Sequence, residues 1–451
     1  MSGEEGAWSA RRLHFVGVGG AGMSAYARAA QALGAEVSGS DLARSSYTER
    51  LASDGVLEAS IGHRAENLPP GAGVELVYSS AVPEDNAERR AARERGLSER
   101  PRAELLGELT ALRRTIAVAG THGKTTTASM LVHALRAAGL HPGWLVGGSV
   151  GAGEPNAHWG RGEWLIVEAD ESDRSMLSLD PEIAVLTNVE LDHHATFASL
   201  AELQGAFSAF LHLARRAIVL PNQAELLALA PDGGGGVALA SYDPPAVTLE
   251  DGGSRFDWRG QQVRLQVPGA HNALNALTAL EAARVAGADL ALAAGALAGF
   301  AGAGRRFQLI GHTARGALVY DDYAHHPTEV LATLRAARTL EHRRLIAVFQ
   351  PHLYSRTLLL AREFGAALAH ADAVVVLEIY PARESAQDFP GVSGLKIAET
   401  SADAAEGRPV YWLASLTDAE RLLDSMLAAG DLCVVMGAGD VDQLAHQLVA
   451  G

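Results

Sequence analysis

The chain has 451 residues, of which 48% are hydrophobic and 20% are charged, and its formal net charge is −16. This composition is typical of a folded protein of about three domains of roughly 150 residues each, and it excludes an intrinsically disordered chain. The negative charge leaves no basic footprint for a nucleic-acid backbone or an anionic membrane, so we expect neither as a partner.

The N-terminal residues and the single cysteine favour a cytoplasmic protein. Residues 1–8 carry acidic side chains in place of the apolar core of a signal peptide. No apolar run is long enough to span a bilayer. Cys433 cannot form an internal disulfide, and its neighbours in Leu-Cys-Val-Val predict a buried strand position. We therefore expect a reducing, cytoplasmic environment.

The first predicted strand covers residues 13–18 and leads through a glycine turn into a helix that reaches residue 30. The turn, Gly17-Val-Gly19-Gly-Ala-Gly22, fits the G-x-G-x-x-G pattern of dinucleotide sites, and Asp41 follows it at about the expected 20 residues. The motif alone leaves three interpretations open: an NAD site, a site for a nucleotide-linked substrate, or tight packing of a strand against a helix.

A second strand is predicted at residues 115–119, and the helix after it includes residues 130–138. Between them lies Gly120-Thr121-His122-Gly123-Lys124-Thr125. The glycines let the backbone approach a polyphosphate, Lys124 neutralises its charge, and Thr125 supplies a hydroxyl to Mg²⁺. Val118 stands where the usual template has a glycine, so this is a shortened phosphate loop. It predicts ATP binding.

Two further apolar runs end in polar residues. Residues 164–167 lead into Glu168-Ala-Asp-Glu-Ser-Asp173, and residues 183–189 lead to Glu190-Leu-Asp-His-His194. The carboxyl ends of parallel strands are where α/β sheets bind ligands, and carboxylate oxygens suit Mg²⁺. Either stretch alone is typical of a solvated loop. Beside a phosphate loop, they predict a metal site.

The central part of the chain is predicted to end in a long helix. Residues 232–236 read as a surface loop, and residues 247–267 as short antiparallel strands joined by glycine-rich turns. An alanine- and leucine-rich stretch then predicts one helical segment over residues 272–297, before the glycines at 299–304. We place the domain boundaries so that the domains cover residues 1–109, 110–303 and 304–451.

The last domain continues the α/β pattern with apolar runs at residues 343–349, 373–377 and 432–436. Two polar motifs follow strand-like runs: Asp321-Asp-Tyr-Ala-His-His-Pro327 and Phe349-Gln-Pro-His-Leu-Tyr-Ser-Arg356. Arg305 and Arg306 lie just upstream. Each motif alone fits a surface loop equally well, but two of them at strand ends predict a binding site in a cleft between domains.

Taken in order, these motifs resemble those of the Mur ligases of peptidoglycan synthesis. The match also includes His271-Asn-Ala-Leu-Asn275, and it covers nearly the whole chain. The resemblance implies an α/β fold with a Rossmann-like N-terminal domain, a central phosphate-loop ATPase domain with a mostly parallel sheet, and a Rossmann-like C-terminal domain that closes over both. It also replaces the NAD interpretation of the first glycine turn with a UDP-sugar site.

The resemblance further implies an ATP- and Mg²⁺-dependent amide ligase. Two motif forms, Glu-Ala-Asp-Glu-Ser-Asp and Asp-Asp-Tyr-x-His-His-Pro, are similar to those of the branch that joins L-alanine to UDP-N-acetylmuramate through an acyl phosphate. The implied roles are those of cell wall biogenesis, cell shape and cell division. The alternative is the recycling branch, which attaches a murein peptide to the same sugar nucleotide.

Individual residues receive roles from the resemblance alone. The sugar nucleotide would contact Gly19, Gly20, Ala21, Gly22, Ser40, Asp41, His63, Ser79, Ser80 and Asn86. ATP would contact Gly120, Thr121, His122, Gly123, Lys124, Thr125, Thr126, Asn272, Asn275, Arg306 and Asp322. Thr125, Glu168 and His193 would hold Mg²⁺. Tyr323, His325, His352 and Arg356 would orient alanine and the acyl phosphate, and the catalytic set would be Lys124, His193, Arg306, His325 and Arg356.

Four positions depart from the family pattern. Leu353 stands where the family commonly has arginine, so Arg356 is expected to bear more of the cationic role. His194 and Ala195 replace the common residues after Asp192-His193. Ala324 occupies a place that is often glycine in the alanine-adding branch and that can be alanine in the recycling branch, which keeps the alternative open.

Overall fold

The structure is a computed structural model that describes residues 7–151, 153–194, 196–231, 236–250 and 252–450. Ala195, the N-terminal segment 1–6 and most of the predicted loop at 232–236 lie outside this described part. The chain divides into two compact units. Unit one comprises Met1–Glu190, Leu200–Pro244 and Ala276–Ala296, and unit two comprises Leu191–Ser199, Pro245–Asn275 and Leu297–Gly451. Within the described part, no helix has both the length and the apolar character needed to span a membrane.

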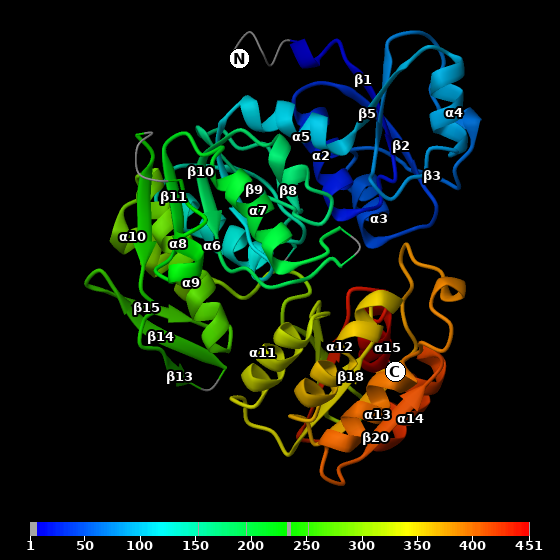
Figure 1. Ribbon diagram of the computed structural model, residues 1–451, viewed down its shortest axis with the longest axis vertical. Helices are drawn as coiled ribbons and strands as arrows, with labels where there is room; N and C mark the ends of the chain where they lie inside the picture. The colour runs from blue at the N-terminus through cyan, green and yellow to red at the C-terminus, as the bar shows by residue number, and fades with distance from the viewer. Residues whose placement is uncertain (1–6, 152, 195, 232–235, 251, 451) are drawn as a thin grey trace. The chain divides into compact units, whose positions relative to one another are not determined.

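The first sheet of unit one is wholly parallel, in the order β3-β2-β1-β4-β5 (Figure 1). Its strands are β1 (Arg12–Val16), β2 (Glu36–Asp41), β3 (Ser60–Ile61), β4 (Val74–Tyr78) and β5 (Ser98–Pro101). The helices between and after them are α2 (Ala21–Ala32), α3 (Ser46–Ser53), α4 (Ala87–Glu94) and α5 (Arg102–Ala111). Because the chain leaves β1 first toward β2 and later toward β4, the strand order reverses at β1, and such sheets bind ligands at this edge.

The second sheet of unit one has the order β12-β11-β10-β6-β9-β7-β8, and only the pair β7–β8 is antiparallel. Its strands are β6 (Arg114–Ala119), β7 (Gly143–Leu145), β8 (Ala157–His158), β9 (Trp164–Glu168), β10 (Pro181–Leu186), β11 (Ala217–Pro221) and β12 (Ala238–Tyr242). Its helices include α6 (Lys124–Ala137), α7 (Leu200–Leu211) and α8 (Ala224–Leu227). Side chains of β6, β9 and β10 are almost all buried, which explains the continuous apolar runs in the sequence.

The helical stretch predicted over residues 272–297 is confirmed, but a break interrupts it. The segment forms two helices, α9 (Ala270–Ala286) and α10 (Leu290–Ala296), followed by a 3-10 turn η3 (Leu297–Gly299). Gly287 has φ +97°, and its N–H donates to Arg284 O, while Asp289 Oδ1 accepts the N–H groups of Ala291 and Leu292. A left-handed glycine ends the first helix and an aspartate caps the second, although the alanine-rich composition continues through both.

The antiparallel strands predicted over residues 247–267 are confirmed. They are β13 (Thr248–Glu250), β14 (Gly253–Trp258) and β15 (Gln261–Leu265), in that order. They belong to unit two.

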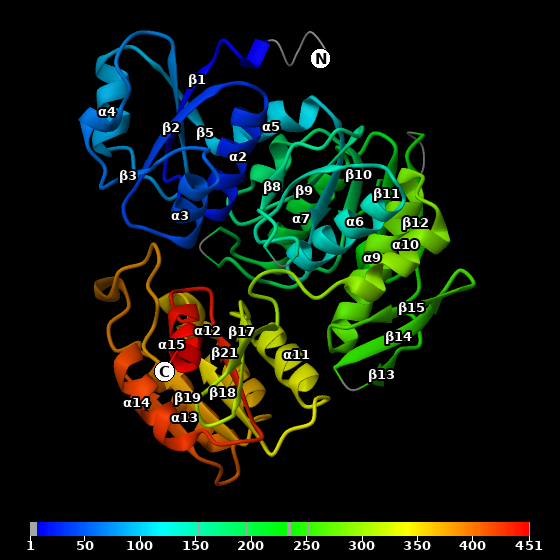
Figure 2. The same cartoon turned by 180° about the vertical axis from the view of Figure 1, so that it is seen from behind.

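Unit two also contains a six-stranded sheet in the order β16-β17-β21-β18-β19-β20, antiparallel only at the β16 edge. Its strands are β16 (Gln308–His312), β17 (Leu318–Asp322), β18 (Arg344–Phe349), β19 (Ala373–Leu377), β20 (Val410–Leu413) and β21 (Asp431–Met436). One face packs on α11 (Pro327–Ala337), α12 (Tyr354–Leu368) and α13 (Leu395–Ala404), and the other on α14 (Leu416–Met426) and α15 (Asp442–Ala450) (Figure 2). Cys433 is fully buried in β21, as predicted.

Candidate active site

The predicted phosphate loop joins β6 to α6. Gly120 has φ +133°, and a side chain there would bring its Cβ to 2.0 Å from Thr187 Oγ1. Gly123 has φ +82° and immediately precedes the first turn of α6. Only glycine fits both positions without strain. The N-terminus of α6, where the backbone N–H groups can bind an anion, therefore follows directly on the glycine loop, and this is the arrangement of a phosphate-binding site.

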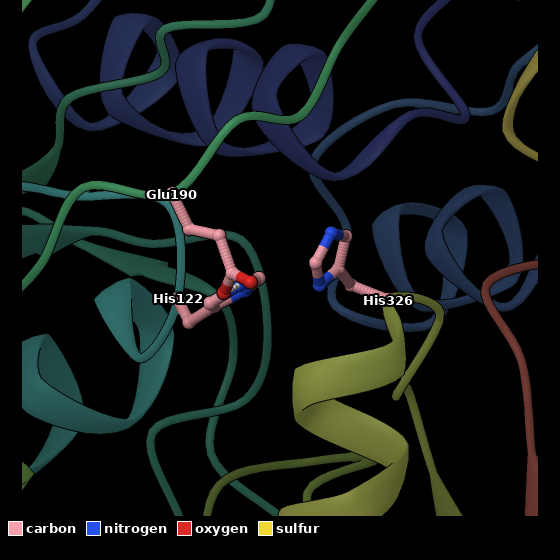
Figure 3. Close-up of side chains that lie close together, drawn as sticks. All are labelled: His122, Glu190 and His326. Atoms are coloured by element: carbon pink, nitrogen blue, oxygen red, sulfur yellow. Dashed lines mark hydrogen bonds and ion pairs between the residues drawn. The ribbon is translucent and has the colours of Figure 1, made fainter. Parts of the chain in front are cut away.

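Residues after β10 hold this loop in place. Asn188 accepts the N–H of His122 with Oδ1 at 2.9 Å and the N–H of Thr121 with its carbonyl at 3.2 Å. The side chains of His122 and Glu190 point toward each other, with Nε2 at 2.9 Å from Oε2 (Figure 3). His326, also drawn there, is the N-cap residue that precedes α11 in unit two. Asn188 was not predicted as a site residue, although it follows one of the apolar runs that marked this region.

Lys124 pairs with Glu171, a residue to which the resemblance assigns no role. Its Nζ donates to the carbonyl of Gly120 at 2.6 Å and to both carboxylate oxygens of Glu171 at 2.9 Å. Burial alone would lower the pKa of Lys124, but the carboxylates of Glu171 and Asp170 raise it above its ordinary value. The loop therefore holds a permanent cation. Glu171 lies in the acidic motif, three residues after the predicted ligand Glu168.

The predicted metal ligands are divided between the two units. Glu168 ends β9 and accepts the N–H of Gly147 at 2.5 Å, and Thr125 lies buried in the first turn of α6. A hydroxyl and a carboxylate oxygen are ligands that Mg²⁺ prefers, so these residues fit that ion. His193 belongs to unit two, with φ +54°. The complete set of three stays a prediction.

Arg102 links the first glycine turn to the acidic motif. Its guanidinium donates to Asp170 and to Asp173, each at 2.7 Å, and a Cβ on Gly22 would lie 3.0 Å from its Nη1. Burial alone would raise the pKa of Asp170, but Arg102 and Lys124 lower it well below its usual range. Arg102 lies between the two predicted ligand sites of unit one, and no motif in the sequence pointed to it.

The predicted sugar-nucleotide residues gather at the carboxyl edge of the first sheet. The carbonyl of Ser40 accepts the N–H groups of Gly17 and Val18 at 2.9 and 3.0 Å, and Asp41 Oδ2 accepts the N–H of Gly19 at 2.7 Å. Ser79 follows β4, and its Cβ lies 3.1 Å from the place of a Cβ on Gly17. These contacts bring the ends of β1, β2 and β4 together.

Other predicted residues of this set have structural partners. Asn86 caps α4 by accepting the N–H groups of Glu88 and Arg89, and the carbonyl of Ala21 accepts Nδ2 of Asn156 at 2.7 Å. Ser80 is exposed. Their contacts with a ligand stay predictions.

In unit two, Arg356 forms a buried ion pair with Asp192. Its Nη2 lies 2.8 and 3.0 Å from the two carboxylate oxygens, and the side chains are only 3% and 4% exposed. Nη1 also donates to Nδ1 of His352 at 3.2 Å. The ring of His325 lies 6.0 Å from that of His352, and 5.3 Å from Tyr323. The two polar motifs of the last domain therefore lie close together, with Asp192 as an additional partner.

Both histidines of this cluster are uncharged at neutral pH. Burial lowers the pKa of His325 to about 4 and that of His352 to about 3. Nδ1 of His325 donates to the carbonyl of Tyr323 at 2.9 Å, which leaves Nε2 as a hydrogen-bond acceptor.

These pKa values predict how stability depends on pH. Unfolded histidine binds a proton below about pH 6.5, whereas folded His325 stays neutral down to about pH 4. The free energy of unfolding should therefore fall as the pH decreases through this window, by up to about 1.4 kcal/mol per pH unit for one histidine. Urea unfolding at several pH values should give a shallower slope for His325→Gln than for the unmodified chain. Equal slopes would contradict the assignment.

Three further residues of unit two, Arg305, Arg306 and Asp322, differ in the groups that they contact. Arg305 donates to Asp321 at 3.0 Å, whereas the Arg306 guanidinium carbon lies 5.1 Å from the ring centre of Tyr323. Asp322 accepts the N–H groups of Phe307 and Ala324 at 2.7 and 2.8 Å, and burial raises its pKa to about 6. The roles of Arg306 and Asp322 at ATP stay predictions.

The predicted adenine contacts lie at the start of α9. Asn272 donates to the carbonyl of Pro268 at 2.8 Å, and Asn275 lies one turn further along the helix, also buried. At the departing position 353, leucine is buried, has φ +73° and donates its N–H to Tyr380. Leu353 is the N-cap residue of α12, the helix that carries Arg356, so a strained backbone conformation lies just before this helix.

A buried parallel strand, a glycine loop, a charged lysine and a helix N-terminus define a nucleotide-binding α/β protein of the phosphate-loop class. Three family models match the chain: Mur ligase family, catalytic domain, over residues 12–114; Mur ligase middle domain over residues 118–283; and Mur ligase, glutamate ligase domain, over residues 305–439. The chain belongs to the Mur ligase family. The predicted resemblance and the predicted α/β fold class are thereby confirmed.

Curated relatives match over almost the full length. The chain is 43% identical to the UDP-N-acetylmuramate--L-alanine ligase of Rubrobacter xylanophilus, with 97% of this chain and 99% of the relative covered. It is 40% identical to the ligase of the same name from Mycolicibacterium smegmatis, with 98% and 95% covered.

Solved structures show the same fold. The UDP-N-acetylmuramate-alanine ligase of Thermotoga maritima matches with a TM-score of 0.82 and 27% identity, over 97% of this chain and 98% of that one. The murein peptide ligase of Psychrobacter arcticus matches with a TM-score of 0.74 and 26% identity, over 98% of both chains.

Proposed function

We propose that this chain joins L-alanine to the lactyl carboxylate of UDP-N-acetylmuramate, with ATP hydrolysed to ADP and phosphate, in peptidoglycan precursor synthesis. The observation that carries the proposal is the identity of 40% to 43% over nearly the whole chain with ligases of that name. Because the reaction uses ATP, we place the protein in the cytoplasm.

We assign the substrates to the three predicted domains. Residues 1–109 bind the sugar nucleotide through the first glycine turn, residues 110–303 bind ATP through Gly120 to Thr126, and residues 304–451 bind the amino acid. Thr125 and Glu168, with His193, hold Mg²⁺, which offsets phosphate charge when it is bound. The remaining predicted contacts keep the roles given above.

The reaction needs activation because the muramoyl carboxylate has no good leaving group. A carboxylate oxygen attacks the γ-phosphorus of ATP, the bond to the bridging oxygen breaks, and ADP leaves with an acyl phosphate formed. The amine of alanine then attacks the carbonyl carbon, an amide forms, and phosphate leaves. Lys124 is placed to stabilise negative charge on the transferring phosphoryl group, because its ammonium lies within the phosphate loop.

Release of phosphate by the purified chain tests the proposal. We expect release from ATP only when UDP-N-acetylmuramate and L-alanine are both present, and an amide product of the corresponding mass. Release that needs neither substrate would overturn the proposal.

The second candidate is a murein peptide ligase, favoured by the fold match to the Psychrobacter arcticus protein and by Ala324. The Thermotoga maritima alanine ligase matches with the higher TM-score. A tripeptide of L-alanine, D-glutamate and diaminopimelate, given in place of L-alanine, distinguishes the two. Turnover with the tripeptide and none with alanine would establish the second candidate.

A further inference from the structure

A buried carboxylate to which the proposed reaction gives no role lies next to β1 and β2 in unit one. Glu88 of α4 is 0% exposed, and its Oε2 accepts from Nε2 of His14 and from Oγ of Ser40, each at 2.8 Å. Its Oε1 accepts from Nδ2 of Asn67 at 2.8 Å. Burial alone would raise the pKa of Glu88, but these three donors lower it. Glu88 is therefore a buried anion.

The hydrogen of Ser40 decides the protonation of a neighbouring histidine. Oγ of Ser40 donates to Glu88, and it lies 3.1 Å from Nδ1 of His63. A hydroxyl has one hydrogen, so this oxygen can only accept from His63. Nδ1 of His63 also lies 3.4 Å from Glu88 Oε1. Both neighbours require a hydrogen on Nδ1, which leaves Nε2 of the neutral ring as an acceptor.

His63 lies at the ligand-binding edge of the first sheet. It follows β3, which pairs with β2 at Ser40 and Asp41. The carbonyl of Asp41 accepts the N–H of Gly62, and its carboxylate accepts the N–H of Gly19 in the glycine turn. Ser40 is fully buried, whereas the side chain of His63 is 18% exposed. The resemblance gave Ser40 a contact with the sugar nucleotide, but its burial makes it a residue that supports the site, and His63 is the member that a ligand reaches.

We propose that Glu88 is a positioning residue that acts through Ser40 to hold His63 with its hydrogen on Nδ1, so that Nε2 accepts a hydrogen bond from the uridine end of the sugar nucleotide. The proposal rests on the proposed function for the identity of that ligand. The group recognised is a hydrogen-bond donor, either the N3–H of uracil or a ribose hydroxyl. A histidine with the opposite tautomer would present a donor there and would repel both groups.

The tautomer is tested on the full chain without any ligand. In ¹⁵N-histidine spectra recorded at about pH 8, we expect the His63 ring to show hydrogen on Nδ1. Loss of signals in His63→Gln assigns the resonance. We expect Ser40→Ala and Glu88→Gln to change the balance of tautomers. A His63 ring with hydrogen on Nε2 in the unmodified chain would overturn the proposal.

Kinetics test the consequence for the substrate. We expect Ser40→Ala and Glu88→Gln to raise the KM for UDP-N-acetylmuramate about two- to tenfold, the effect of one net hydrogen bond, with kcat and the KM for ATP unchanged. Ser40→Ala keeps the buried carboxylate of Glu88, so this variant still tests the proposal if Glu88→Gln fails to fold. His63→Gln, whose Oε1 can replace the Nε2 acceptor, should retain more affinity than His63→Leu. An unchanged KM in Ser40→Ala would contradict the proposal.

His14→Gln is the matched control, because His14 contacts the same carboxylate through Nε2, and its Nδ1 lies 2.9 Å from Oγ of Ser38, which is not a predicted ligand contact. We expect a lower melting temperature with an unchanged His63 spectrum and KM.

The donor group on the ligand is identified by comparing UDP, 3-methyl-UDP and 2′-deoxy-UDP as competitors. The analogue that lacks this donor should bind the unmodified chain more weakly than UDP does. It should bind His63→Leu no more weakly than UDP binds that variant. If no analogue loses affinity in this way, Nε2 accepts from no uridine group. Failure of UDP-N-acetylmuramate turnover would leave the spectra valid, so the two proposals fail separately.

Discussion

Replacing Lys124 by methionine should lower kcat by about 10²- to 10³-fold, the range found when one group that stabilises transition-state charge is removed. Methionine keeps most of the apolar stem and removes the ammonium that donates to Gly120 and to Glu171. The same substitution should weaken ATP binding, because the loop loses its cation. Phosphate release at saturating substrates and calorimetry with ADP measure the two effects.

Lys396, in α13, provides the matched control, because Lys124 and Lys396 are the only lysines of the chain. Lys396→Met removes the same group from the other unit, and we expect kcat to stay within about twofold, as for a surface substitution. Turnover of Lys124→Met equal to that of Lys396→Met would show that the loop does not act in phosphoryl transfer.

Asp192→Ala should destabilise unit two by about 3–5 kcal/mol, because it leaves the guanidinium of Arg356 buried without its counter-ion. Asp192→Asn should cost less, since the amide oxygen can still accept from Arg356. Turnover should fall as well, because Arg356 also donates to His352. Urea unfolding followed by circular dichroism measures the free energy.

The ion pair of Arg421 and Asp418 is the surface comparison, with side chains 76% and 51% exposed. Arg421→Ala should change the free energy of unfolding by no more than about 0.5 kcal/mol. Arg356 holds the pKa of Asp192 well below its usual range, although burial alone would raise it. The stabilisation is therefore present above the unfolded pKa of about 3.9 and is lost as the pH falls below it. A destabilisation by Asp192→Ala as small as that of Arg421→Ala would refute the buried role.

Local features of the fold and of the site followed from the sequence. The strand before Gly120 and the helix after Gly123 are encoded by apolar runs and by glycines that the tight turn requires. The acidic motif at the end of β9 was identified for the same reason, since a buried parallel strand must place its polar residues beyond its carboxyl end. The break at Gly287 was missed because alanine favours a helix on both sides of it.

The sequence by itself therefore determined the α/β class, the phosphate loop and the family, because these depend on residues that are neighbours along the chain. Only the tertiary structure decided which charges pair. Burial pairs Lys124 with Glu171, and Arg356 with Asp192 at a separation of 164 residues. Burial also brings the hydroxyl of Ser40 to the carboxylate of Glu88. A charge removed from water must find a partner, and no local pattern specifies which distant side chain will be that partner.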